Sequence, residues 1–255
     1  MFSSAATSSM VRNRPAVFPM SSLDLSWRER GRVGRGSGRR FRRPRPVLAP
    51  AGNAAFLSGG WLTVASVRVQ EARLLSWALL DDPGLRRRWS HVQAVARRAE
   101  ELAGQLRLDD EDAEVLVAAA WLHDCGYSPL IAAGFHPVDG ARYLRRFGAP
   151  ETVCCLVANH SGAAVEAEVR GRSAELAEFP AVGGVIDDAL TCADMETSST
   201  GTHLSVRARV AEILARYRPG DAVHTAVSRS APQLIAVVER THLRIRRGHA
   251  RARAS

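Results

Sequence analysis

The stretch VLVAAAWLHDCG, residues 115–126, decides how this chain folds. It is apolar on nearly every side, so a helix formed by it belongs in the interior. The acidic residues 109–112 precede it and suit the positive end of such a helix. Gly126 is expected to cap the other end. The helix therefore places His123 and Asp124 among apolar groups, where a carboxylate is costly to bury unless something pairs with it.

Helical spacing of apolar residues continues on both sides of this stretch. Val92, Val95, Ala99 and Leu102 recur on one face of the segment before it. We find no convincing strand alternation and no internal repeat, so the predicted fold class is all-α. The other predicted helices cover residues 69–80, 83–106, 137–147, 151–159, part of 163–179, 185–195, 204–217 and 221–245.

The net charge of +9 belongs to the start of the chain. Residues 1–60 hold 11 arginines against two acidic residues, whereas the two kinds balance in the rest of the sequence. Residues 1–65 are rich in Ser, Gly, Arg and Pro and lack periodicity, which predicts a disordered tail. Two explanations stay open: a basic tail that attracts anionic partners, or a start codon upstream of a shorter protein. Residues 66–246 are predicted to form the domain, followed by a basic tail at 247–255.

The composition argues against several functional classes. No run of 18 apolar residues occurs, so no transmembrane helix and no membrane partner are predicted. The predicted domain has no excess charge, which makes nucleic acid an unexpected partner. The four cysteines form no C-x-x-C pair and lie in apolar patterns, which indicates buried thiols in a cytoplasmic protein. An export signal around Arg39-Arg40-Phe41 is the alternative, although the region before it is long and irregular.

Further polar residues share the apolar scaffold with His123 and Asp124. His91, His136 and His160 lie at the margins or ends of predicted helices, and Asp194 lies in the buried pattern ALTCADMET. A divalent cation would resolve the burial of these carboxylates, with imidazoles as further ligands. The alternative is that these residues have structural roles only, as core histidines with satisfied hydrogen bonds and as helix caps. The remaining histidines are interpreted as surface or structural: His203, His224, His242 and His249.

The order H…HD…H…H…D resembles the HD-domain superfamily of metal-dependent phosphohydrolases. The blocks WLHDCGYSPL, GFHPVDGARYL, VANHSGA and LTCADMETS carry this resemblance, which covers residues 85–214. It implies an all-α HD-domain helical bundle with one or two divalent metal ions per chain, drawn from Fe, Mn, Co, Ni, Zn or Mg. It implies four core ligands, His91, His123, Asp124 and Asp194, and two more for a second metal, His136 and His160, with Asp124 between the ions.

The resemblance implies hydrolysis of a phosphate ester or anhydride in a nucleotide or other small phosphorylated molecule. Asp124 would orient the attacking water or accept its proton, and His136 or His160 would act on the leaving group if one metal binds. A catalytically weak, metal- or nucleotide-binding regulatory module is the alternative. Tyr127 and Arg142 are candidate substrate contacts. Alternatively, Tyr127 only packs against its neighbours, and Arg142 lies on a solvated helix face.

The chain departs from the superfamily pattern at several points. Cys125-Gly126-Tyr127 follows the HD pair, where many members have a lysine, and the Gly-Tyr-Pro signature of cyclic-di-GMP phosphodiesterases does not occur. The texts HPVDGA and NHSGA resemble the branch that cleaves dinucleoside tetraphosphates, whereas ADMETSSTG does not match that branch clearly. Substrate, metal identity and oligomeric state therefore stay open.

Overall fold

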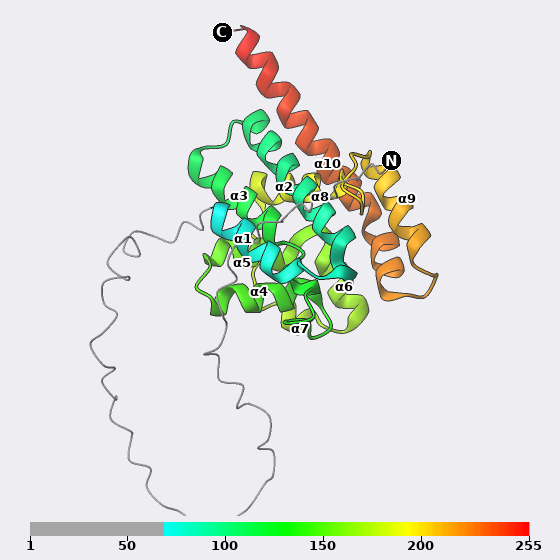
Figure 1. The fold of residues 1–255 in the computed structure, drawn as a ribbon. Coiled ribbons are helices and arrows are strands. Elements are labelled where there is room, and N and C mark those ends of the chain that lie inside the picture. The colour runs from blue at the N-terminus through cyan, green and yellow to red at the C-terminus, as the bar shows by residue number, and fades with distance from the viewer. Residues whose placement is uncertain (1–68, 255) are drawn as a thin grey trace, which may run out of the picture. The chain divides into compact units, whose positions relative to one another are not determined.

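The computed structural model describes residues 69–254, which contain helices and no strands (Figure 1). The all-α prediction is confirmed, and the predicted disordered tail lies outside the described residues. Three short 3-10 turns are η1 (Pro83–Leu85), η2 (Cys125–Tyr127) and η3 (His160–Gly162). The α-helices are α1 (Val69–Leu80), α2 (Arg86–Leu106), α3 (Asp110–Leu122), α4 (His136–Arg146), α5 (Glu151–Asn159), α6 (Ala163–Arg170), α7 (Ser173–Leu176), α8 (Gly184–Met195), α9 (Val206–Arg216) and α10 (Ala222–Ala254).

The apolar helix α3 lies at the centre of the packing, as its sequence predicts. Every residue from Leu116 to Leu122 is buried, and α3 packs against α1, α2, α5 and α8. Its first turn is closed by Asp109, whose carboxylate accepts a hydrogen bond of 2.9 Å from the backbone N–H of Asp112. Burial of each large apolar side chain stabilises the fold by about 1.5–3 kcal/mol. This interior packing fixes the end of α3, where the HD pair lies.

Gly126 does not cap α3 as predicted. It lies inside η2, and its φ is not among the positive ones. A Cβ atom at this position would lie 1.9 Å from the carbonyl oxygen of His136, which explains why glycine is needed. The close approach presses η2 against the first turn of α4. It therefore brings Asp124 and His136 together from segments 12 residues apart.

The C-terminal helix is longer than predicted. It continues past residue 245 and through the segment expected to be a basic tail, as far as Ala254. Figure 1 shows its last turns extending past the other helices. Earlier turns pack against α6, α8 and α9. Asp188 of α8 accepts hydrogen bonds from both Arg240 and Arg244, which join α10 to α8.

Two other sequence predictions concern the cysteines and membrane-spanning helices. All four cysteines are buried and unpaired, as predicted: Cys125, Cys154, Cys155 and Cys192. Within residues 69–254, no helix combines the length and the apolar character that crossing a membrane would require.

Candidate metal centre

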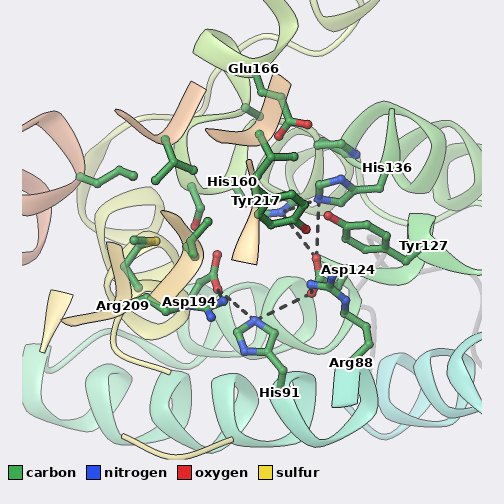
Figure 2. Close-up of a pocket in the computed structure, with 18 of the residues that line it drawn as sticks. Arg88, His91, Asp124, Tyr127, His136, His160, Glu166, Asp194, Arg209 and Tyr217 are labelled. Atoms are coloured by element: carbon green, nitrogen blue, oxygen red, sulfur yellow. Dashed lines mark hydrogen bonds and ion pairs between the residues drawn. The ribbon is translucent and has the colours of Figure 1, made fainter. Parts of the chain in front are cut away.

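The structure brings all six predicted ligands together. Figure 2 shows five of them, all except His123. They come from different parts of the chain: His91 from α2, His123 and Asp124 from the end of α3, His136 from the start of α4, His160 from η3 and Asp194 from α8. Five are buried and His136 is half-buried. Their ligand atoms fall into two groups, one formed by His91, His123 and Asp194 and one by Asp124, His136 and His160.

The first group approaches the spacing of ligands around one cation. The Nε2 atom of His91 lies 3.0 Å from Oδ1 of Asp194 and 3.4 Å from Nε2 of His123. Ligand atoms that share a cation at about 2.0–2.2 Å lie roughly 3–3.6 Å apart. These two separations match that spacing, and the third, between His123 and Asp194, stays within 4.8 Å.

The second group is nearly as compact. The Nε2 atoms of His136 and His160 lie 3.3 Å apart, and they lie 3.6 and 3.9 Å from Oδ1 of Asp124. The other oxygen of the same carboxylate, Oδ2, lies 3.4 Å from Nε2 of His123 and 3.8 Å from Nε2 of His91. Asp124 therefore faces one group with each of its oxygens, which is the placement that a bridging ligand requires.

Backbone carbonyls orient three of the imidazoles. The Nδ1 atoms of His91, His123 and His160 lie 2.9, 2.8 and 2.6 Å from the carbonyl oxygens of Ser198, Ala120 and Val157, respectively. A carbonyl oxygen only accepts, so each Nδ1 carries the hydrogen. In the neutral tautomer the lone pair of Nε2 then points into the centre, where it faces other lone pairs and carboxylates. A cation shared by these atoms removes the repulsion, so the donor set fits a metal.

The electrostatics favour the protonation states of metal ligands at most positions. Burial alone raises the pKa of Asp124, but Arg88 and His123 outweigh it and hold this pKa well below its usual range. Asp194 is likewise held low, against burial, by His91 and His123. Burial and the neighbouring imidazoles lower the pKa values of His136 and His160. Carboxylates are thus ionised and these two imidazoles neutral, as coordination requires.

His123 differs from His136 and His160. Burial lowers its pKa, but Asp124 and Asp194 outweigh burial and raise it. A proton on His123 therefore occupies the position that a cation would take, and metal ions and protons compete there.

Arg88 is a functional residue that sequence reasoning missed. Its Nη1 donates a hydrogen bond of 2.6 Å to Oδ2 of Asp124. Its guanidinium lies over the ring of Tyr127 at 3.8 Å, and that ring stacks on His136 with 3.9 Å between centroids. The sequence spacing could have indicated this role, because Arg88 stands three residues before His91 and therefore on the same face of α2.

The centre lies in an open pocket, and all of its predicted ligands except His123 line that pocket. Among the residues that line it are Arg88, Tyr127, Glu166, Arg209, Arg216 and Tyr217. Apolar side chains complete the wall: Ile213, Val223, Val227 and Leu234. The pocket lining therefore combines the charged groups around the centre with apolar side chains.

Other candidate residues lie elsewhere. Arg142 does not line the pocket, because its guanidinium binds Glu178 and, at 2.9 Å, Glu175. The histidines interpreted as surface or structural do not line this pocket either: His203, His224, His242 and His249.

A third group of possible ligands consists of Cys192, Glu196 and His242. There, Arg98 donates two hydrogen bonds of 2.9–3.0 Å to Glu196, and Nε2 of His242 lies 2.6 Å from the same carboxylate. The charge of Glu196 is already balanced by Arg98, so this group fits a structural ion-pair network.

Comparison with known proteins identifies the family. A family model described as HD domain matches residues 88–217, which is half of the chain and spans all six ligands. No curated protein and no solved structure matches the chain. The match begins at Arg88 and ends at Tyr217, both of which line the pocket. The chain belongs to the HD domain family, within the superfamily of metal-dependent phosphohydrolases.

Proposed function

We propose that this protein is a metal-dependent hydrolase of phosphate esters or anhydrides. The observation that carries the proposal is the position of Asp124, whose two oxygens face two separate groups of ligands. Divalent cations held by such groups lower the pKa of water and neutralise the charge of phosphoryl oxygens. The candidate metals are Fe, Mn, Co, Ni, Zn and Mg, and the imidazole-rich set favours the transition metals.

The protein's own side chains would orient the reaction. Arg88 fixes the rotation of the Asp124 carboxylate through a 2.6 Å hydrogen bond and holds it ionised. An ionised carboxylate in this position would hold the cations and orient the attacking water. Tyr127 covers His136 on one side and keeps its ring in place. With one metal bound, the neutral imidazoles of His136 and His160 would be free to exchange a proton with the leaving group.

The pocket supports a nucleotide or a similar small phosphorylated molecule as substrate. Its charged groups suit a phosphoryl group, whereas Ile213, Val227 and Tyr217 offer a surface for a flat or apolar moiety. Four buried, unpaired thiols support a reducing compartment, and we propose a cytoplasmic location. The regulatory-module alternative gains no support, because every predicted ligand reaches the centre.

The experiment begins with the metal content of the purified full chain. The protein, loaded in turn with Mn, Fe, Co and Mg, is then given a panel of nucleotides, dinucleoside polyphosphates and simple phosphoesters. We expect at least one substrate to be hydrolysed, and we expect Asp124→Asn to lose this activity. A loaded protein that hydrolyses nothing on the panel would contradict the proposal, as would activity that survives Asp124→Asn.

A further inference from the structure

Arg209 is a buried arginine whose hydrogen-bonding capacity is only partly used. It lies on α9, 5% exposed, and it lines the pocket beside Asp194 (Figure 2). Its Nη1 donates a hydrogen bond of 2.6 Å to Glu212. Glu212 also accepts hydrogen bonds from the backbone N–H and the hydroxyl of Ser199, at 3.2 and 2.7 Å. The guanidinium is thus anchored from one side.

The opposite edge of this guanidinium has no hydrogen-bond partner among the described residues. Nε is buried and unpartnered, and Nη2 lies 3.8 Å from Oδ1 of Asp194, which is too far for a hydrogen bond. The N–H groups of Nε and Nη2 point in the same direction and form a fork that matches two oxygens of a phosphate. Buried N–H groups are rarely left unpaired, so this edge needs an explanation.

Arg88 is not left with a buried, unpartnered donor. Its Nη1 is bound to Asp124, and one face of its guanidinium is covered by Tyr127. The Arg88 side chain is 23% exposed, so solvent can reach its other N–H groups, whereas Nε of Arg209 is buried without a hydrogen-bond partner among the described residues.

A second buried polar atom in the same pocket lacks a partner. Ser161 lines the pocket, and its hydroxyl oxygen is buried without a hydrogen bond among the described residues. Its backbone is left-handed, with φ 46° and ψ 48°, a conformation that is strained for any residue other than glycine. Strained residues with unused polar groups are typical of ligand sites. Two independent donors thus lack partners in one pocket.

We propose that the Nε–Nη2 edge of Arg209 binds the phosphoryl group of the substrate at the Asp194 side of the metal centre, with the Ser161 hydroxyl as a further donor to the bound molecule. This inference rests on the proposed function, because it names the group that holds the phosphate. The chemical class that such a fork recognises is a tetrahedral oxyanion with at least two free oxygens. Arg209 is then a substrate-binding residue and not only a neighbour of Asp194.

The test uses the metal-loaded full chain and inorganic phosphate as the probe, with affinity measured by titration calorimetry. Arg209→Gln removes the charge and the fork, and we expect its phosphate Kd to rise about 10–100-fold while metal content stays at the wild-type value. Arg209→Lys keeps the charge without the fork, and we expect a smaller rise. Arg207→Gln is the matched control, because Arg207 lies on the same helix, is 72% exposed and pairs with Glu239. Its Kd should not change.

Two results would overturn the inference. One is an unchanged phosphate Kd in a folded Arg209→Gln protein with full metal content. The other is metal loss in Arg209→Gln with full recovery of both metal and phosphate binding in Arg209→Lys, which would make Arg209 a support for Asp194. If Arg209→Gln does not fold, Arg209→Lys decides alone, and wild-type phosphate affinity there refutes the fork.

The phosphate titration requires no turnover, so failure of the inference and failure of the proposed function are distinguishable. Loss of phosphate binding in the Arg209 variants, together with a wild type that hydrolyses nothing, would uphold the inference and refute the function. A wild type that hydrolyses phosphoesters, with a KM and a phosphate Kd that Arg209→Gln leaves unchanged, would do the reverse.

Discussion

Replacing Gly126 by alanine should disrupt the metal centre, although Gly126 is not one of the predicted ligands. The added Cβ would lie 1.9 Å from the carbonyl oxygen of His136 and 2.8 Å from the backbone nitrogen of Gly140. Both contacts are with the backbone of α4, so no side chain can rotate away. Real Cβ contacts essentially never fall below 3.0 Å, and α4 must therefore retreat from η2 by about 1.1 Å. That movement carries His136 away from Asp124, with which it shares a ligand group.

Two magnitudes follow from this displacement. Overpacking of a tight contact costs about 1–3 kcal/mol of unfolding free energy, which lowers Tm by roughly 2–4 °C per kcal/mol in a domain of this size. A misplacement of about 1 Å in a catalytic arrangement can reduce the rate by about 100-fold. We therefore expect Gly126→Ala to melt several degrees lower, to bind metal more weakly at the His136 group and to lose most hydrolysis.

Calorimetric melting and metal titration measure these effects, with Gly104→Ala as the matched control. Gly104 lies in α2, the helix that carries His91, but a Cβ there meets nothing within 4 Å. Alanine at this helical position should stabilise the protein by about 0.5–1 kcal/mol and leave the centre unchanged. The reasoning is refuted if Gly126→Ala melts, binds metal and turns over like the wild type.

Two further changes test separate parts of the account. Ser161→Gly removes the unpartnered hydroxyl and relieves a left-handed backbone conformation that costs about 1–2 kcal/mol. We therefore expect calorimetry to show weaker phosphate binding and an equal or higher Tm. A clearly lower Tm would contradict this expectation. Burial raises the pKa of Glu212, but hydrogen bonds from Arg209 and Ser199 outweigh burial and lower this pKa to about 2. The ionised Glu212 therefore stabilises the fold above the unfolded pKa near 4.5, and this stabilisation is lost as the pH falls toward 2. The Tm difference between wild type and Glu212→Gln should therefore be largest near neutral pH and shrink toward pH 3, and a constant difference would count against the ion pair with Arg209.

The sequence predicted most of the helices and singled out the six side chains that the structure brings together, for identifiable physical reasons. An apolar run that ends in His123-Asp124 requires partners for a buried carboxylate, and periodicity locates the other helices. Arg88 could have been found from helical spacing, since it lies one turn before His91. Arg209 could not, because its contact with Asp194 depends on how α9 meets α8. The role of Gly126 also required the structure, since a close approach of η2 and α4 leaves no local pattern.

Asp124 faces both groups of ligands, and we propose that it joins them into one centre for two cations. The most direct measurement is the metal stoichiometry of the full chain, loaded with Mn(II) or Fe(II) and freed of excess ions, for wild type, His136→Ala and Asp124→Ala. We expect two ions per chain for the wild type, one for His136→Ala and less than one for Asp124→Ala, with helical circular dichroism retained in all three. A wild type that saturates at one ion, or an Asp124→Ala protein that keeps two, would contradict this proposal.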